Sequence, residues 1–222
     1  ESLENFVEEE IFRRLSGSEK RLLGALAVFR DAVPIEAISD LDINMDLMDD
    51  LVEKGLARQI DSETFDVHDL IREFLLVSME DDLRQQLHIN AAAHYRKVRT
   101  TRSDHLEFLH HLAASGEVLE FAETLSMVGN SLVAAGHVSL LGIIDSIDTS
   151  DLDDEYLVDI LETKGDLLIL QNRWEDAEEC HNEALPIAKA LKRADQGARL
   201  LSSLADIEVH HGRLDSALKL LD

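Results

Sequence analysis

The chain has 222 residues, of which 46 are acidic and 21 are basic, so its formal net charge is −25. A surface this acidic repels phosphate backbones, and nucleic acid is therefore an unfavourable partner. Hydrophobic residues make up 45% of the chain, which is enough for one sizeable core or two smaller ones. No apolar run reaches the roughly 18 residues that a membrane span needs. The single cysteine, Cys180, excludes an internal disulfide and agrees with a cytoplasmic location.

Leu, Ala, Glu and Asp dominate the composition, which favours a mainly α protein. Residues 2–15 are expected to form an amphipathic helix. Ser16 followed by Glu19 is a capping box, which predicts that a second helix starts here. Pro34 is expected at the first position of a short helix, and a further helix is expected over residues 45–54.

The next stretch changes from helix to strand and back to helix. Gly55 is expected to end the preceding helix, because glycine adopts the left-handed conformation at helix ends. Short strands are expected over residues 56–60 and 64–67, where a polar turn separates β-branched and aromatic residues. A helix is expected over residues 69–76. Helices followed by a two-stranded wing are the order of a winged-helix domain, which we expect over residues 1–79.

The expected third helix of this domain has the wrong charge for a DNA-reading helix. It carries four carboxylates and one lysine, namely Asp46, Asp49, Asp50, Glu53 and Lys54. Carboxylates facing phosphates oppose binding. The sequence therefore predicts a winged helix that has a structural or protein-contacting role.

Helices with tight turns follow to the end of the chain. An irregular helical arm is expected over residues 80–150, including a long helix over residues 81–98. In residues 151–222, small and turn-forming residues recur 40 positions apart, pairing Gly165 with Ala205, Asn172 with Gly212, and Ala177 with Ala217. This period predicts helical hairpins of tetratricopeptide type, which stack into an α-superhelix with a concave surface.

Neither a metal site nor a catalytic site is expected in the chain. Two pairs of histidines are adjacent in sequence, His110–His111 and His210–His211, and neighbours in a helix point to different sides. His88 and His94 are too far apart in sequence to share one helix face as ligands. Neither a P-loop motif nor a nucleophile elbow occurs in the sequence, so we do not expect the chain to be an enzyme by itself.

The order of these parts resembles the middle of a STAND-type signalling ATPase, the group of apoptosome-like and large ATP-dependent regulators. The resemblance rests on LSGSEKRLLGALAVF, the wing, VHDLIREFL, LHINAAAHY, HHLAASGE and the tetratricopeptide hairpins. In that family a P-loop domain precedes the winged helix, and a repeat array senses the signal. Because the chain begins without Met and ends within an apolar-faced helix, we expect it to be part of a longer protein.

One motif of this family can be matched to the sequence residue by residue. Val67, His68 and Asp69 stand where the family has Met-His-Asp. The resemblance implies that His68 reaches the phosphate of bound ADP and that Asp69 caps the helix, which together hold a closed resting state. ATP or ADP, with magnesium, would belong to a nucleotide-binding domain in cis. The residues alone also allow a simpler interpretation, in which Asp69 is only an N-cap and His68 only a surface histidine.

These observations predict the regulatory and sensing part of a multidomain signalling ATPase. The winged helix is expected to pack on the nucleotide-binding domain, and the repeats to bind a protein or small-molecule signal. One alternative is a stand-alone tetratricopeptide scaffold for protein interactions. A less favoured alternative is a DNA-binding transcriptional regulator, which the acidic third helix opposes.

Overall fold

The structure is a computed structural model that describes residues 15–41 and 45–221. The expected helix over residues 2–15 lies outside these ranges except for its last residue. Contacts divide the chain into two compact units, residues 1–115 and 116–222. The sequence placed boundaries after residues 79 and 150 instead, and those boundaries stay a prediction.

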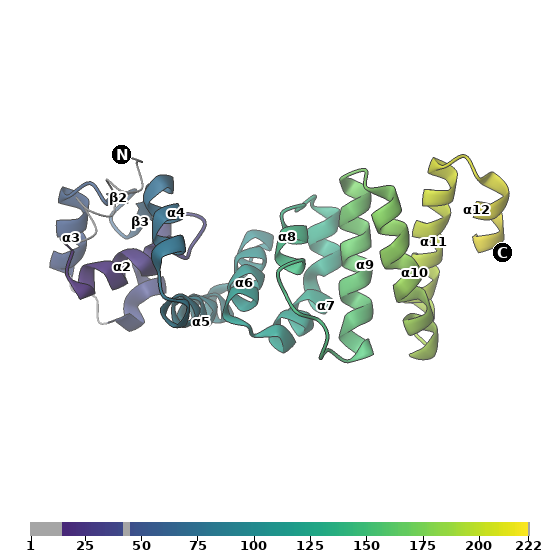
Figure 1. Ribbon diagram of the computed structural model, residues 1–222, viewed down its shortest axis with the longest axis horizontal. Coiled ribbons are helices and arrows are strands. Elements are labelled where there is room, and N and C mark those ends of the chain that lie inside the picture. The colour runs from purple at the N-terminus through teal and green to yellow at the C-terminus, as the bar shows by residue number, and fades with distance from the viewer. Residues whose placement is uncertain (1–14, 42–44, 222) are drawn as a thin grey trace. The chain divides into compact units, whose positions relative to one another are not determined.

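The first unit begins with a helix-and-strand bundle and continues with two long helices (Figure 1). The bundle elements are α2 (Gly17–Ala27), β1 (Val33–Pro34), η3 (Ile35–Leu41), α3 (Met45–Glu53), β2 (Ala57–Gln59), β3 (Thr64–Val67) and α4 (Asp69–Ser78). The two helices that follow are α5 (Asp81–Val98) and α6 (Arg102–Ser115). The predicted order of helices, wing and helix is present, and the mainly α class is confirmed.

The capping box at the start of α2 forms as the sequence predicts. The backbone N–H of Glu19 donates to Ser16 Oγ at 3.2 Å, and the backbone N–H of Ser16 donates to Glu19 Oε2 at 2.7 Å. Two of the amide groups that a helix start leaves without partners are thereby satisfied.

The sheet has one strand more than the expected two-stranded wing. Strands β2 and β3 pair antiparallel, and β1 pairs with the other edge of β3, with Val33 opposite Phe65. Pro34 therefore lies in β1, and the short helix starts at Ile35. This corrects the expectation that Pro34 opens that helix. Proline has no N–H to donate, which an edge strand tolerates.

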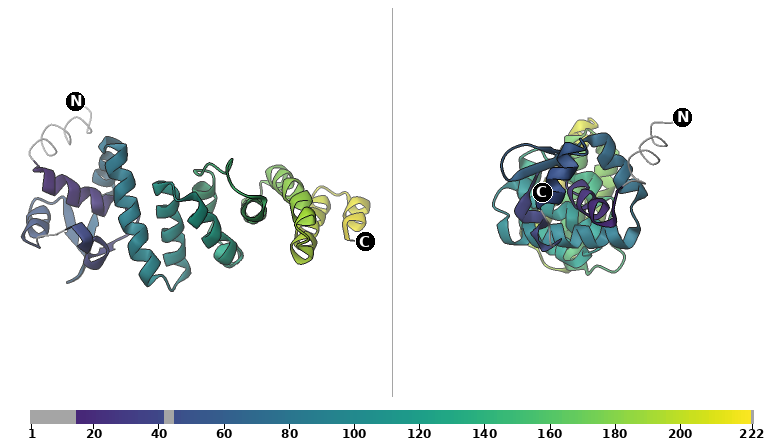
Figure 2. Two further views of the ribbon diagram at one scale, coloured as in Figure 1. Left: turned by 90° about the horizontal axis from the view of Figure 1, so that it is seen from below. Right: turned by 90° about the vertical axis from the view of Figure 1, so that its left-hand side faces the viewer.

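One hydrophobic core joins the sheet to the helices of the first unit. Helix α2 packs against β3 and α4 (Figures 1 and 2). The core includes fully buried side chains from α2, α3, β3 and α4, among them Leu23, Leu26, Met48, Leu51, Phe65 and Leu75. Leu87 and Ala91 add α5 to the same core.

The second unit consists of helices joined by tight turns (Figure 1). They are α7 (Val118–Ala134), α8 (Leu140–Ile144), α9 (Asp154–Leu170), α10 (Trp174–Ala190), α11 (Ala194–His210) and α12 (Leu214–Leu221). Each helix from α9 to α12 packs against the next one in the chain. Within the described residues, no helix is long and apolar enough to cross a membrane.

The repeat residues singled out from the sequence do what their types predict. Asn172 and Gly212 have positive φ angles of 58° and 76° in the turns after α9 and α11, a conformation that both residue types tolerate. Gly165 lies against the ring of His181, so its missing side chain lets α9 and α10 approach closely. Lys192 takes the same left-handed conformation after α10, with φ 59°, although its residue type does not predict it.

Candidate functional site

His68 and Asp69 lie at the junction of β3 and α4, and both side chains are exposed. Nδ1 of His68 accepts the backbone N–H of Leu70 at 3.4 Å. The His68 carbonyl accepts the N–H groups of Ile71 and Arg72 at 2.8 and 2.9 Å. His68 is therefore the N-cap, which corrects the expectation that Asp69 caps the helix, an expectation shared by the resemblance and by the interpretation from the residues alone. Asp69 is already the first helical residue, and its carboxylate accepts a hydrogen bond from Arg72 at 3.0 Å.

The cap determines what the imidazole of His68 can offer to a ligand. Because Nδ1 accepts a hydrogen bond, the neutral ring carries its proton on Nε2. That N–H is a hydrogen-bond donor on an exposed side chain. It stands at the positive end of the α4 dipole, where anions are favoured.

Arg72 links this junction to two carboxylates. It donates to Asp66 at 2.6 Å as well as to Asp69 at 3.0 Å, and Arg58 donates to the other oxygen of Asp66. Partial burial pushes the pKa of Asp66 upward, but the hydrogen bonds from Arg58 and Arg72 outweigh it and the net shift is downward. Asp66 is therefore ionised at neutral pH and fixes the position of Arg72 under the start of α4.

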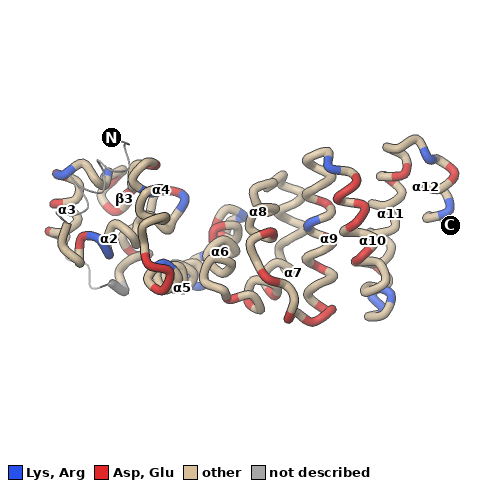
Figure 3. The backbone as a smooth tube through the Cα atoms, viewed as in Figure 1, with Lys and Arg blue, Asp and Glu red and all other residues tan. Residues whose placement is uncertain are grey.

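The acidic face of α3 is exposed as the charge pattern predicts. It consists of Asp46, Asp49, Asp50 and Glu53 (Figure 3). The lysine that follows, Lys54, forms a hydrogen-bonded ion pair with Glu19. That bond, with those from Ser16, holds the pKa of Glu19 at about 2. The only basic side chain of this segment is thus paired within the bundle, which argues further against DNA contact by α3.

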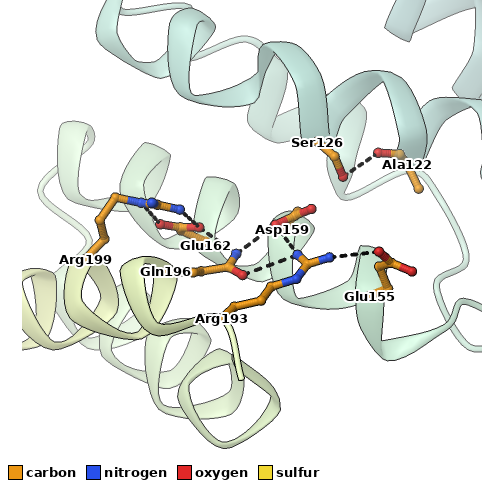
Figure 4. Close-up of polar contacts among 8 residues, drawn as sticks. All are labelled: Ala122, Ser126, Glu155, Asp159, Glu162, Arg193, Gln196 and Arg199. Carbon is orange, nitrogen blue, oxygen red and sulfur yellow. Dashed lines mark hydrogen bonds and ion pairs between the residues drawn. The ribbon is translucent and has the colours of Figure 1, made fainter. Parts of the chain in front are cut away.

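A second polar feature, the α9–α11 ladder, lies in the second unit (Figure 4). It consists of Glu155, Asp159 and Glu162 on α9, with Arg193, Gln196 and Arg199 at the start of α11. Arg199 donates to both oxygens of Glu162 at 2.7 and 3.1 Å. Gln196 Nε2 donates to Glu162 and to Asp159, each at 2.7 Å.

The ladder runs from a buried end to an exposed end. Glu162 and Gln196 are 5% and 4% exposed, so the hydrogen bond between them forms away from water, where it contributes more than at a surface. At the other end Arg193 donates to Asp159 at 3.1 Å and to Glu155 at 3.2 Å. The Glu155 side chain is 67% exposed, so a ligand can reach this end of the ladder and replace the contact between Glu155 and Arg193.

The sequence spacing of the ladder residues shows how α9 and α11 are aligned with each other. The three carboxylates occupy positions i, i+4 and i+7 and so share one face of α9. Asp159 pairs with Gln196, and Glu162 with Arg199, in each case 37 positions apart. The repeat interval is 40. Asp159 and Glu162 therefore each meet a side chain about one helical turn before their own repeat equivalents.

Asp166 continues the acidic face of α9 beyond the ladder. The hydroxyl of Ser203 donates to it at 3.4 Å, and Nε2 of His181 lies 3.5 Å from it. Burial, followed by repulsion from Glu162, raises the pKa of Asp166 to about 6. This carboxyl group is therefore partly protonated just below neutral pH.

Sequence reasoning did not identify the ladder or a buried group of histidines in the first unit. The ladder does have a signal in the sequence. Carboxylates at i, i+4 and i+7 on one helix are followed by Arg, Gln and Arg about one repeat later. The histidine group has no comparable spacing, because its members lie on two helices.

Comparison with known proteins agrees with the predicted repeats. Residues 156–222 match the family model of the tetratricopeptide repeat. No curated protein matches the sequence. Among solved structures, the chain is similar to a Signal Transduction ATPase with Numerous Domains (STAND) protein with a tetratricopeptide repeat sensor, from Pyrococcus horikoshii. Sequence identity is 16% and the TM-score is 0.42, and the match covers 99% of this chain and 45% of the other.

Proposed function

We propose that this chain, with tetratricopeptide repeats at residues 156–222, is the regulatory and sensor part of a multidomain STAND-type ATPase. One observation carries the proposal. The repeats follow, in the same chain, a bundle of winged-helix order that presents an exposed histidine at the start of α4. This is the order of parts that the family resemblance implies.

The bundle would pack on a nucleotide-binding domain in cis, with His68 donating its Nε2 proton to a phosphate oxygen of ADP. ATP, ADP and magnesium would be held by that domain. The exposed His68 side chain and the N-terminal end of α4 support this role, because both favour an anion. Asp69 would otherwise oppose the phosphate, but its charge is partly offset by Arg72.

The repeats would bind the signal, which is a protein or a small molecule. Tetratricopeptide hairpins present extended surfaces for such ligands. The exposed end of the α9–α11 ladder offers a carboxylate and a guanidinium for polar contacts. A ligand that binds the open arrangement more tightly than the closed one would shift the population and withdraw His68 from ADP.

The sequence that precedes Glu1 is the first test of this proposal. A P-loop motif in the same gene upstream of Glu1 would support it. If no P-loop precedes Glu1, the chain is instead a tetratricopeptide scaffold, the alternative that the repeat match by itself supports. Salt-dependent DNA binding in a gel-shift assay would instead support the transcriptional regulator, against the exposed acidic face of α3.

The second test is the retention of ADP by the intact protein. His68→Ala removes one hydrogen bond to phosphate, so we expect ADP to dissociate about three- to tenfold faster and basal activation to rise. The matched control is His105→Ala on α6, whose ring is bonded to the Thr101 carbonyl at 2.8 Å, and it should leave both quantities unchanged. Unchanged ADP retention and basal activation in His68→Ala would contradict the mechanism.

A further inference from the structure

Three histidines of the first unit lie together between α5 and α6. His88 comes from α5, and His110 and His111 come from α6. One ring nitrogen from each lies within 4.8 Å of the others. His88 is 4% exposed, His111 is fully buried and His110 is half-buried. We call these residues the histidine cluster.

The cluster forms because two neighbours on one helix both contact a residue of the facing helix. His110 and His111 leave α6 in directions about 100° apart, yet their ring centroids are 5.1 Å apart. The ring of His88 completes a nearly equilateral triangle, with its centroid 5.5 Å from that of His110 and 5.2 Å from that of His111. The close packing of α5 against α6 therefore brings together ligand atoms that sequence spacing separates.

The hydrogen bonds of the cluster leave one nitrogen without a partner. Nδ1 of His88 and Nδ1 of His111 are 2.9 Å apart, so one donates and the other accepts. Nε2 of His111 is buried and has no hydrogen-bond partner among residues 15–41 and 45–221. Leaving a buried polar atom unpaired costs free energy, so the cluster's own hydrogen bonds do not satisfy all of its buried nitrogens.

Burial also keeps the cluster in the form that binds metals. It lowers the pKa of His88 to about 4 and that of His110 to about 3. It lowers the pKa of His111 as well, with help from the other two rings. The three imidazoles are therefore neutral at pH 7 and have lone pairs available without losing a proton.

We propose that His88, His110 and His111 bind one divalent transition-metal ion, with zinc as the expected ion. Three histidines are a known ligand set for zinc, which leaves a fourth position for water or another ligand. The ion would link α5 to α6 inside the first unit. This site shares no residue with the junction at His68 or with the repeats, so it goes beyond the proposed function.

The distances are close to those of a zinc site. Zinc–nitrogen bonds of about 2.0–2.1 Å at tetrahedral angles place ligand nitrogens about 3.4 Å apart. The His88–His111 pair at 2.9 Å would open by about 0.5 Å, and a pair at the 4.8 Å limit would close by about 1.4 Å. Binding would therefore require ring movements of up to about 1.4 Å toward the ion.

Two neighbouring groups suit a bound cation. His110 donates a hydrogen bond to the backbone carbonyl of Val28, as zinc-binding histidines commonly do with their second nitrogen. Arg30 and Arg84 are nearby positive charges that would oppose the ion. Each is paired with a carboxylate, Arg30 with Glu107 and Arg84 with Asp81, which partly compensates these charges.

The test is a titration of the metal-free chain with Co²⁺ and with Zn²⁺. We expect one ion per chain, the visible absorption of tetrahedral Co²⁺, its displacement by Zn²⁺, and a rise in the melting temperature with Zn²⁺ concentration. His110→Gln should weaken binding at least a hundredfold, because one of three ligands is lost. His105→Gln on the same helix should bind as the wild type does.

Two results would overturn the proposal. One is a wild-type chain that binds no stoichiometric ion and melts at the same temperature with and without Zn²⁺. The other is binding that persists in His110→Gln, or that is lost in His210→Gln, because the ion would then lie elsewhere. Circular dichroism checks that each variant is folded. If His110→Gln does not fold, the histidine ring signals of the wild type in NMR, with and without Zn²⁺, decide whether His88 and His111 bind the ion.

Discussion

A methyl group added at Gly165 would collide with the ring of His181. A Cβ atom built there lies 2.5 Å from Cε1 and 2.8 Å from both ring nitrogens of His181. The ring is fully buried in α10, so it cannot move into solvent. Overpacking of this kind costs about 1–3 kcal/mol, and alanine recovers about 1 kcal/mol of helix propensity. We expect Gly165→Ala to lower the free energy of unfolding of the second unit by up to about 2 kcal/mol.

Gly197 provides the matched control. It lies within α11, and a Cβ atom built there has no neighbour within 4 Å among the described residues. Only the propensity gain remains, so Gly197→Ala should raise the free energy of unfolding by about 0.5–1 kcal/mol. The two substitutions are chemically identical and should shift stability in opposite directions.

The assay is urea unfolding of each variant, followed by the fluorescence of Trp174. This is the only tryptophan, and it stacks on His210 within the repeats, with ring centroids 4.0 Å apart. Removing the ring in Gly165→Ala/His181→Ala should abolish the penalty of the added methyl group when compared with His181→Ala alone. The reasoning is wrong if Gly165→Ala is as stable as Gly197→Ala, or if the penalty persists without the ring.

Two further predictions concern the polar side chains of α9 and α11. Burial and the charge of Glu162 raise the pKa of Asp166 from 3.8 to about 6. The folded protein therefore binds the proton of this carboxyl group more tightly than the unfolded chain does. The contribution of Asp166 to the free energy of unfolding accordingly falls as pH rises from about 4 to about 6. Asp166→Asn should therefore become more stable relative to the wild type as pH rises across this range, as measured by urea unfolding at several pH values. A difference in free energy of unfolding that does not change with pH would show that the raised pKa of Asp166 is not the cause. Gln196→Ala removes the donor shared by Asp159 and Glu162, and we expect a loss of about 1–3 kcal/mol. A change below about 0.5 kcal/mol in the same assay would show that water replaces the amide.

Local patterns predicted much of the backbone. The capping box at Ser16 and Glu19 forms, and the two strands on either side of the turn pair as expected. Asn172 and Gly212 adopt the left-handed turns that their residue types favour. These features depend on residues within a few positions of one another, so their physical cause is contained in a short stretch of sequence.

The candidate site was predicted less completely. The sequence placed His68 and Asp69 at the start of a helix, which the structure bears out. The prediction that Asp69 caps this helix was wrong, because Asp69 is already helical and His68 is the cap. The role of His68 toward ADP stays a prediction that the ADP-retention experiment tests.

The sequence by itself determined the mainly α class, the order of the elements apart from β1, the repeat interval and the acidic face of α3. The tertiary structure alone decided that Val33 pairs with Phe65, that the α9–α11 ladder forms, and that His88 meets His110 and His111. Helix and strand periodicity specify which face of an element is apolar. They do not specify the register at which two distant elements meet, and that register is what brings these side chains within bonding distance.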